Sequence, residues 1–254
     1  MIMNRPRVAL LAASLLLTGC GGGAMASPGH PSGAANAQAS TPGISPLASP
    51  SPQMSIAAAP LHLPGLGPRT LARIPSAARQ AVVVTGRARN SALSTVVVYE
   101  RTTAGWQAGA TWPAHNALKG WSDHHMGGDL RSPIGVFGLT DGGGLLGNPG
   151  TRLPYHHAGG FTSPGTGFKG EPLAGSFDYV IAINYNRRPG TSPLDWTRPL
   201  GANRGGGIWF HVDHGGPTHG CVSIAENHMK ELLRVLDPGL HPVVVMGDAT
   251  SLDR

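Results

Sequence analysis

The stretch "HVDHGGPTHGCVSI", His211–Ile224, decides how this chain folds and what it does. It places three histidines and one cysteine within fourteen residues. Upstream, the apolar run "GGGIWFHV" predicts a strand that ends at His211. Downstream, the periodic stretch "SIAENHMKELLRVLDP" predicts a helix that begins just after Cys221. Three chemistries fit such a loop: a zinc site, half of a disulfide, or a thiol nucleophile with its base.

The sequence predicts both where the helix after Cys221 begins and where it ends. Ser223 and Glu226 have the spacing of a capping box, and Pro238 stops the helix. The apolar face follows the 3, 4, 7 spacing through Met229, Leu232, Leu233 and Leu236. We therefore expect Cys221 to lie at the helix N-terminus.

Short β-branched runs separated by Gly and Pro predict strands throughout the rest of the domain. "STVVVYERTTAGWQAGATW" is a hairpin with its turn at 103–105, and "FDYVIAINYN" alternates so that Tyr179, Ile181, Ile183 and Tyr185 share a face. This spacing predicts a mostly β domain over residues 80–247, with either a β-sandwich or a barrel as its architecture, and of the two we expect the β-sandwich. The Gly- and Pro-rich segment 141–176 is either a functional loop or an insertion. The other predicted strands are 81–86, 133–144, 205–212 and 242–246.

The first sixty residues are not expected to belong to the folded domain. Arg5 and Arg7 precede a short apolar run, and Leu17-Thr18-Gly19-Cys20 then resembles the lipobox of bacterial lipoproteins. An ordinary signal peptide with a chance cysteine is the alternative. We expect a signal peptide over 1–20, lipid on Cys20, and a disordered Ser/Pro/Ala-rich tether over 21–60. The protein would then be extracytoplasmic and held at the membrane, facing the cell wall.

The charge of the chain is mild. The formal net charge is +6, and removal of two arginines with the leader leaves 17 basic against 13 acidic residues, or +4. The arginines are scattered and are not interleaved with aromatic residues, which argues against a nucleic-acid partner. A solvated basic surface explains the excess, and it also suits an anionic cell-wall polymer.

The cysteine count favours the thiol reading. If Cys20 carries lipid, Cys221 has no partner within the chain, and an odd cysteine in an extracytoplasmic protein suggests a reactive thiol. A nearby imidazole or a helix N-terminus lowers the pKa of such a thiol. Gly220 allows close backbone approach, so the amides of residues 220 and 221 suit an oxyanion hole. A small buried cysteine remains an alternative.

A zinc peptidase is a further alternative. Its scattered candidate ligands would be His124, His156 and His211. The chain has no His-Glu-x-x-His run and no acidic residue at ligand spacing, so we expect neither a metal nor another cofactor. The adjacent pairs 124–125 and 156–157 are read as loop residues, and His214 as solvated.

His211 followed by Thr218-His219-Gly220-Cys221 resembles the L,D-transpeptidase catalytic-domain family of bacterial peptidoglycan cross-linking enzymes. "RSPIGVFGL", 131–139, looks like that family's Thr-Pro-x-Gly-x-Phe strand, with Ser132 in place of Thr. The resemblance covers about residues 80–247. In well-known members a hydrophobic residue and then Arg or Asn follow the cysteine. Here Val222 and Ser223 follow, so a substrate carboxylate contact from that arginine is missing.

The resemblance implies a role for each matching residue. Cys221 would be the nucleophile and His211 its base, while His219 and the amides of Gly220 and Cys221 would hold the oxyanion or position the substrate. Thr218 and Tyr185 are candidates for substrate contact; Tyr179 and Tyr155 compete for the role given to Tyr185. Either Asp213 or a backbone carbonyl would orient His211.

The implied reaction is peptidoglycan cross-linking through a thioester on Cys221, with stem peptides as partners and carbapenems as acylating inhibitors. Two alternatives stay open. One is an L,D-carboxypeptidase that uses water at the same site. The other is a non-catalytic peptidoglycan-binding lipoprotein, which would not need an intact Cys-His pair.

Overall fold

The structure is a computed structural model, and it describes residues 59–254. The expected signal peptide, the lipid site Cys20 and nearly all of the tether lie outside these residues. Within 59–254 we find no helix that is both long and apolar enough to cross a bilayer. The elements are α1 (Pro68–Leu71), α2 (Glu226–Val235), α3 (Ala249–Leu252) and eleven strands: β1 Gln80–Gly86, β2 Leu93–Thr102, β3 Gly105–His115, β4 Trp121–Ser122, β5 Ser132–Pro133, β6 Gly135–Gly144, β7 Tyr155–His157, β8 Val180–Ile183, β9 Trp209–Val212, β10 Val222–Ile224 and β11 Val243–Asp248.

Nine of the strands form one sheet that closes on itself. The order is β11-β1-β2-β3-β10-β9-β8-β6-β7, and β11 also pairs with β6. The described residues therefore confirm a mostly β domain. The closed sheet corresponds to the barrel alternative, and the expected sandwich is not confirmed. Register shifts between Leu139 and Asp141 and between Val97 and Tyr99 mark irregularities of the kind that coil a sheet toward closure.

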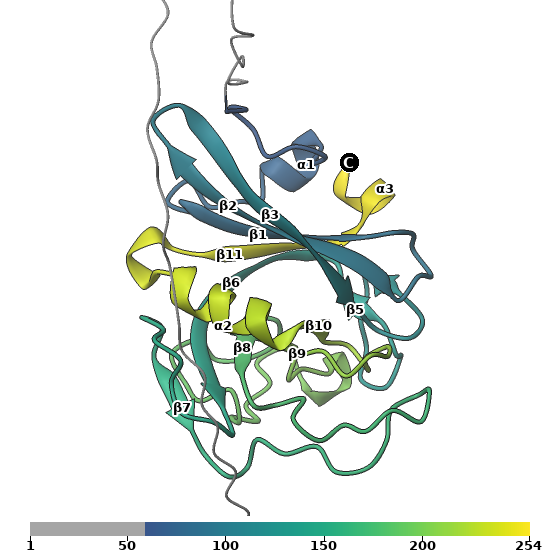
Figure 1. Cartoon of the computed structure of the whole chain (residues 1–254). Coiled ribbons are helices and arrows are strands. Elements are labelled where there is room, and N and C mark those ends of the chain that lie inside the picture. Colours follow the sequence, from purple (N-terminus) through teal and green to yellow (C-terminus); the bar gives the residue numbers. More distant parts are fainter. Residues whose placement is uncertain (1–58) are drawn as a thin grey trace, which may run out of the picture. The chain divides into compact units, whose positions relative to one another are not determined.

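Strands β1 and β11 explain how the sheet closes. They pair in parallel, with Val82 opposite Val244 and Val83 opposite Val245. Val82 and Val244 face the main core, while Val83 and Val245 face a second core on the other side. Because both faces are buried, the sequence reads as a continuous apolar run, as in strands covered on both sides. Figure 1 shows α2 on one side of these strands and α1 with α3 on the other.

The second core includes residues that precede the expected start of the domain. Leu63 and Leu66 pack with Val83, Tyr99 and Trp106 in this cluster. Leu252 of α3 joins the same cluster, and the Gly67 N–H donates to the Leu252 carbonyl at 2.9 Å. The packed region therefore extends beyond residues 80 and 247 in both directions.

Helix α2 lies in the expected segment, but its start differs from the expectation. The helix begins at Glu226 with Ala225 as its N-cap and with no side-chain cap, so the predicted capping box is wrong. Ser223 instead lies in β10, and its hydroxyl donates to Asp213 at 2.6 Å. The apolar face enters the main core as the spacing predicted, through Met229, Leu232, Leu233 and Leu236.

Candidate active site

The parallel pair β9 and β10 places the histidine and the cysteine on one face. Val222 pairs with Phe210, and both side chains are fully buried in the main core. Neighbouring side chains along a strand point to opposite faces. His211 and Cys221, each next to one of these core residues, therefore lie together on the face away from the core.

The Cys221 thiol lies at the wall of a pocket. Its sulfur accepts the Trp209 backbone N–H at 3.4 Å and lies 3.6 Å from the Gly207 carbonyl oxygen, to which the S–H donates. The pocket has a volume of about 320 Å³. Its walls are mainly apolar, with one cationic side chain, and consist of Gly160, Thr162, Phe177, Pro193, Leu194, Trp196, Arg198, Gly206, Gly207, Trp209 and Cys221.

His211 is oriented by a backbone carbonyl. Its Nδ1 lies 2.9 Å from the Val212 carbonyl oxygen. A carbonyl can only accept, so Nδ1 carries the proton and Nε2 keeps its lone pair when the ring is neutral. The Phe177 ring packs edge-on against the imidazole, with centroids 5.4 Å apart. Of the two groups that could have oriented His211, the structure selects the carbonyl.

The carboxylate of Asp213 forms its hydrogen bonds with groups other than His211. Its carboxylate accepts from the Ser223 hydroxyl and the Gly215 N–H, and it pairs with His115 Nδ1 at 2.8 Å. Burial raises the pKa of Asp213, but the hydrogen bonds from His115 and Ser223 outweigh this and bring that pKa to about 2. Asp213 therefore holds the start of the loop between β9 and Cys221 as a charged group.

His214 is not the solvated residue that the sequence suggested. Its side chain is 6% exposed, and its ring stacks on that of His211 with centroids 5.7 Å apart and planes 7° from parallel. Glu171, from the Gly-rich segment 141–176, holds His214 Nδ1 at 3.1 Å. Part of that segment therefore contacts the site through Glu171.

Burial favours the neutral form of both Cys221 and His211. It raises the pKa of Cys221 to about 11, against a smaller lowering by the Trp209 N–H. It lowers the pKa of His211 to about 4, although the bond to Val212 acts in the opposite direction. The expected lowering of the thiol pKa is therefore absent, and α2 begins only at Glu226, too far along the chain to cap the thiolate.

Two hydroxyl groups contact the backbone carbonyl of Cys221. Thr218, 3% exposed, donates its hydroxyl to the Cys221 carbonyl at 2.6 Å, and the Ser132 hydroxyl lies 3.5 Å from the same oxygen. Within residues 59–254, the N–H groups of Gly220 and Cys221 make no hydrogen bond. A Cβ at Gly220 would lie 2.9 Å from Ile208 Cδ1, so the glycine lets this turn pack closely against the Ile208 side chain. Two free amides therefore lie beside the thiol.

The remaining candidate residues lie around this centre. The Tyr185 hydroxyl is directed at the carbonyls of Arg204 and His125, at 2.9 and 3.1 Å. His219 is exposed, and its ring packs on Phe168 with centroids 4.6 Å apart. Contact of Tyr185, Thr218 or His219 with substrate stays a prediction.

The scattered histidines do not assemble. His124 is exposed on a turn, and His156 lies on β7, where its ring meets Phe161. In the part of the chain that the structure describes, no three His, Cys, Asp or Glu side chains are arranged to hold a metal ion. The zinc alternative gains no support from this geometry.

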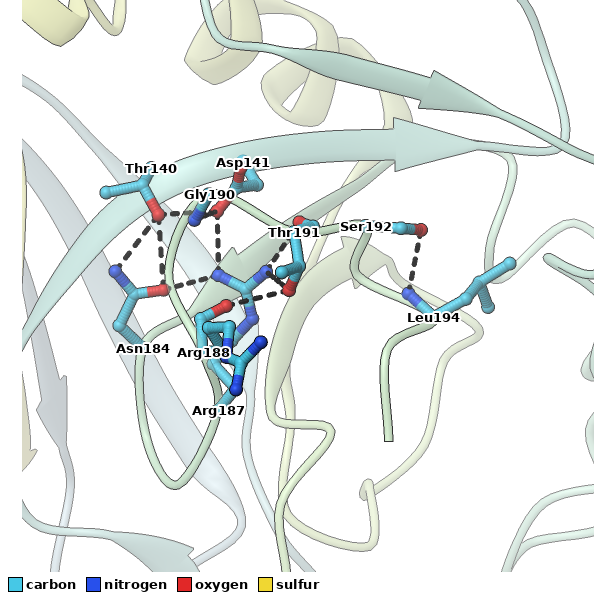
Figure 2. A network of polar contacts seen from close by, with 9 residues as sticks. All are labelled: Thr140, Asp141, Asn184, Arg187, Arg188, Gly190, Thr191, Ser192 and Leu194. Atoms are coloured by element: carbon cyan, nitrogen blue, oxygen red, sulfur yellow. Dashed lines mark hydrogen bonds and ion pairs between the residues drawn. The ribbon is translucent and has the colours of Figure 1, made fainter. Parts of the chain in front are cut away.

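The outer wall of the pocket comes from the segment 184–207, which we call the pocket loop. Figure 2 shows its anchor, the buried ion pair of Arg187 and Asp141 at 2.8 Å, with both side chains under 5% exposed. Arg187 also donates to the Thr191 carbonyl, and Asp141 accepts the Gly190 N–H at 3.0 Å. Asn186 fixes the other end through the carbonyls of Gly201 and Gly205.

Sequence reasoning missed these loop residues. The signal was present, because "NRRPGTSPLDWTRPLGANRGGG", 186–207, gathers four arginines in a chain in which only 13% of residues are charged. Neither the burial of Arg187 beside Asp141 nor the closeness of Arg198 to Cys221 can be read from that composition.

These observations define a class of protein. It is a closed, mostly β domain in which a histidine on one strand and a cysteine just before the adjacent parallel strand share one site. The family model of the L,D-transpeptidase catalytic domain, YkuD, matches residues 78–245. The chain therefore belongs to the L,D-transpeptidase catalytic-domain family, and the resemblance drawn from the Thr-His-Gly-Cys motif is confirmed.

The search of solved structures returns Bd1075 of Bdellovibrio bacteriovorus at 18% sequence identity and a TM-score of 0.38. The match covers 69% of this chain and 52% of that one, so this chain spans about half the length of Bd1075. The search of curated proteins gives no match.

Proposed function

We propose that this chain is a cysteine-dependent L,D-transpeptidase that cross-links peptidoglycan stem peptides, with Cys221 as nucleophile and His211 as its base. One observation carries the proposal. Cys221 opens into a pocket on the face that also carries His211, whose Nδ1 bond to Val212 leaves Nε2 free to accept a proton. A pure binding module would need neither feature.

The first half-reaction forms the acyl-enzyme. His211 Nε2 takes the thiol proton as Sγ attacks the carbonyl carbon at the L-centre of the diamino acid in a stem tetrapeptide. The free amides of Gly220 and Cys221 are placed to stabilise the oxyanion that develops. The C–N bond then breaks, His211 returns the proton to the leaving amine, D-alanine departs, and a thioester remains.

The second half-reaction decides between cross-linking and hydrolysis. An amine from a second stem attacks the thioester, His211 accepts a proton from it, and the thiol is regenerated as the new amide forms. Water in place of the amine would make the enzyme an L,D-carboxypeptidase. We propose an amine as the acceptor because the matching family model describes an L,D-transpeptidase catalytic domain.

We further propose that the protein is anchored outside the cytoplasm by lipid on Cys20. The register of Leu17-Thr18-Gly19-Cys20 after an Arg-flanked apolar run supports this. The stem peptides of the cell wall would then lie within reach of the tethered domain. Loss of membrane fractionation in Cys20→Ala is the expected result, and unchanged fractionation would contradict it.

Mass spectrometry of the intact protein tests the chemistry. Incubation with a carbapenem should add one inhibitor mass to the wild type and none to Cys221→Ala. A donor tetrapeptide with an amine acceptor should then give the cross-linked product, and its absence beside released tripeptide would favour the carboxypeptidase. Absence of any adduct on the folded wild type would favour the non-catalytic binder.

A further inference from the structure

Arg198 is a cation in the wall of the cysteine pocket; Asp195 attracts it electrostatically, but no carboxylate among residues 59–254 forms a salt bridge with it. Its guanidinium donates to the backbone carbonyls of Asp195 and Thr197, both at 3.1 Å. No Asp or Glu side chain within residues 59–254 forms an ion pair with it, whereas the neighbouring Arg187 is paired with Asp141. Both bonds from Arg198 use Nη1, which leaves the Nη2 and Nε donors available.

The pocket loop is built to hold this guanidinium close to the thiol. Gly205, Gly206 and Gly207 all have positive φ, and a Cβ at Gly206 would overlap the Nε and Cδ atoms of Arg198. Arg198 Nη2 lies 3.5 Å from the position that a Cβ of Gly207 would take. The carbonyl of that same Gly207 accepts from Cys221 at 3.6 Å. Gly207 therefore lies next to both the Arg198 guanidinium and the Cys221 thiol.

A second contact fixes the orientation of Arg198. The guanidinium carbon lies 4.8 Å from the centroid of the Trp196 ring, in a cation–π arrangement. Trp196 itself is 80% exposed, which is unusual for so large an apolar side chain, and both residues line the pocket. The pair presents a flat, oriented donor set to whatever enters.

We propose that Arg198 recognises a carboxylate of the acyl-donor peptide and thereby selects the substrate of Cys221. This inference rests on the proposed acyl transfer at Cys221. A planar guanidinium with two free donor atoms matches a carboxylate in geometry and charge, and the apolar walls weaken competition from water.

A stem tetrapeptide whose diamino acid bears a side-chain carboxylate offers two carboxylates for this contact. One is the C-terminal carboxylate of the leaving D-amino acid, which is two bonds beyond the scissile nitrogen. The other is the side-chain carboxylate of the diamino acid that supplies the scissile carbonyl. Both have the same chemistry, so the experiment must separate them.

The test compares acylation of Cys221 by three donor tetrapeptides in wild type and Arg198→Gln. One donor has both carboxylates free, the second is amidated at its C-terminus, and the third at the diamino-acid side chain. We expect Arg198→Gln to lower kcat/KM for the free donor about 10–100-fold, the range for a charged hydrogen bond. One amidated donor should be poor with the wild type and insensitive to the substitution, which identifies the recognised carboxylate.

Three controls separate this inference from the proposed function. Arg188→Gln changes an exposed arginine of the same loop that does not line the pocket, and it should leave all three donors unchanged. Alkylation of Cys221 by neutral iodoacetamide should be equal in wild type and Arg198→Gln, which shows an intact thiol. Arg198→Lys, which keeps the charge without the planar fork, should give an intermediate loss.

Equal sensitivity of all three donors to Arg198→Gln would overturn the assignment, as would no sensitivity at all. If no donor acylates the wild type, the proposed function fails first. If donors acylate the wild type while Arg198→Gln behaves like Arg188→Gln, only the carboxylate assignment fails.

Discussion

At the scale of single residues, the protonation of His211 and Cys221 distinguishes two ways of making a thiol reactive. Some cysteine enzymes hold a preformed thiolate beside an imidazolium, which requires a lowered thiol pKa. Here burial acts in the opposite direction on both groups, with pKa values of about 11 for Cys221 and about 4 for His211. In the proposed mechanism, a neutral pair requires that the proton move only as the substrate is attacked.

The pH profile of alkylation tests this neutral pair. With a thiol pKa of about 11, the thiolate fraction rises with pH throughout the range below 11. His211, with a pKa of about 4, stays neutral from pH 6 upward and adds no inflection. Iodoacetamide alkylation of Cys221 should therefore rise about tenfold per pH unit from pH 7 to 9. A plateau across neutral pH would indicate a thiolate–imidazolium pair instead.

Substitution of the base should separate chemistry from thiol reactivity. His211→Gln should lower acylation by a donor peptide about 10²–10⁴-fold, the usual cost of losing a general base. It should leave the alkylation profile close to that of the wild type, because the buried imidazole does not stabilise a resting thiolate. His219→Gln is the matched control, since that ring is exposed against Phe168 and should cost acylation far less.

At the scale of elements, the pocket loop owes its position to a few buried polar contacts. Apart from the short 3₁₀ turn Ala202–Arg204, its residues 184–207 form no regular element, so neither a strand ladder nor a long helix fixes them. The Arg187–Asp141 pair and its bonds to Gly190 and Thr191 tie one end of the loop to β6. Leu194, which lines the pocket, follows this anchor directly.

Breaking the anchor should cost stability and substrate binding together. Arg187→Met leaves Asp141 as a buried carboxylate without its partner, a change that typically costs about 3–5 kcal/mol. We expect a lower thermal midpoint and a raised KM for the donor peptide. Alkylation of Cys221 at pH 9 should change little, because β9 and β10 hold the thiol independently. Calorimetry and acylation kinetics measure these effects.

A second pair of variants shows whether the loss comes from the unpaired charge. Asp141→Asn combined with Arg187→Met removes both charges and should recover part of the stability lost in the single variant. Arg188→Gln is the neighbouring control, because only its backbone carbonyl takes part in the network of Figure 2. A stability loss in Arg188→Gln as large as that in Arg187→Met would contradict the role of the buried pair.

At the scale of the whole domain, residues before β1 are part of the packed structure. Leu63, at 2% exposure, and Leu66 cover the face of β1 and β11 that points away from the main core. The backbone also joins the two ends of the described region, since the Arg69 N–H donates to the Arg254 carbonyl at 2.8 Å. The segment 59–79 thus closes the second core together with α3.

Truncation tests this closure. A chain that starts at residue 59 should unfold at the same temperature as the full-length protein. A chain that starts at residue 70 loses Leu63 and Leu66 and uncovers Tyr99 and Trp106, so it should lose at least about 3 kcal/mol of stability. For a domain of this size that corresponds to about 6–12 °C.

A point substitution supports the truncation. Leu63→Ala in the full-length protein should cost about 2–5 kcal/mol, the range for a buried leucine. Leu61→Ala is the matched control, because Leu61 is 76% exposed two residues away. Equal thermal midpoints for the chains starting at residues 59 and 70 would show that the second core does not depend on the preceding segment.

Local patterns in the sequence were enough to predict the longer strands and the helix face of this protein, but not the short strands β4, β5, β7 and β10. The β-branched runs of β1 and β11 and the hairpin turn between Thr102 and Gly105 follow from residue type and spacing, as does the apolar face of α2. The Thr-His-Gly-Cys motif identified the family because its residues lie close together in the chain.

The tertiary structure decided what depends on partners distant in sequence. Ser223 has the spacing of a helix cap, but β10 pairs it with β9 and β3, and Asp213 takes its hydroxyl, so the helix begins later. Closure of the sheet through β11 and β6 cannot be read from strand spacing, since a sandwich and a closed sheet share it. The same holds for the pKa of Cys221 and the position of Arg198, because burial and closeness are properties of the folded chain.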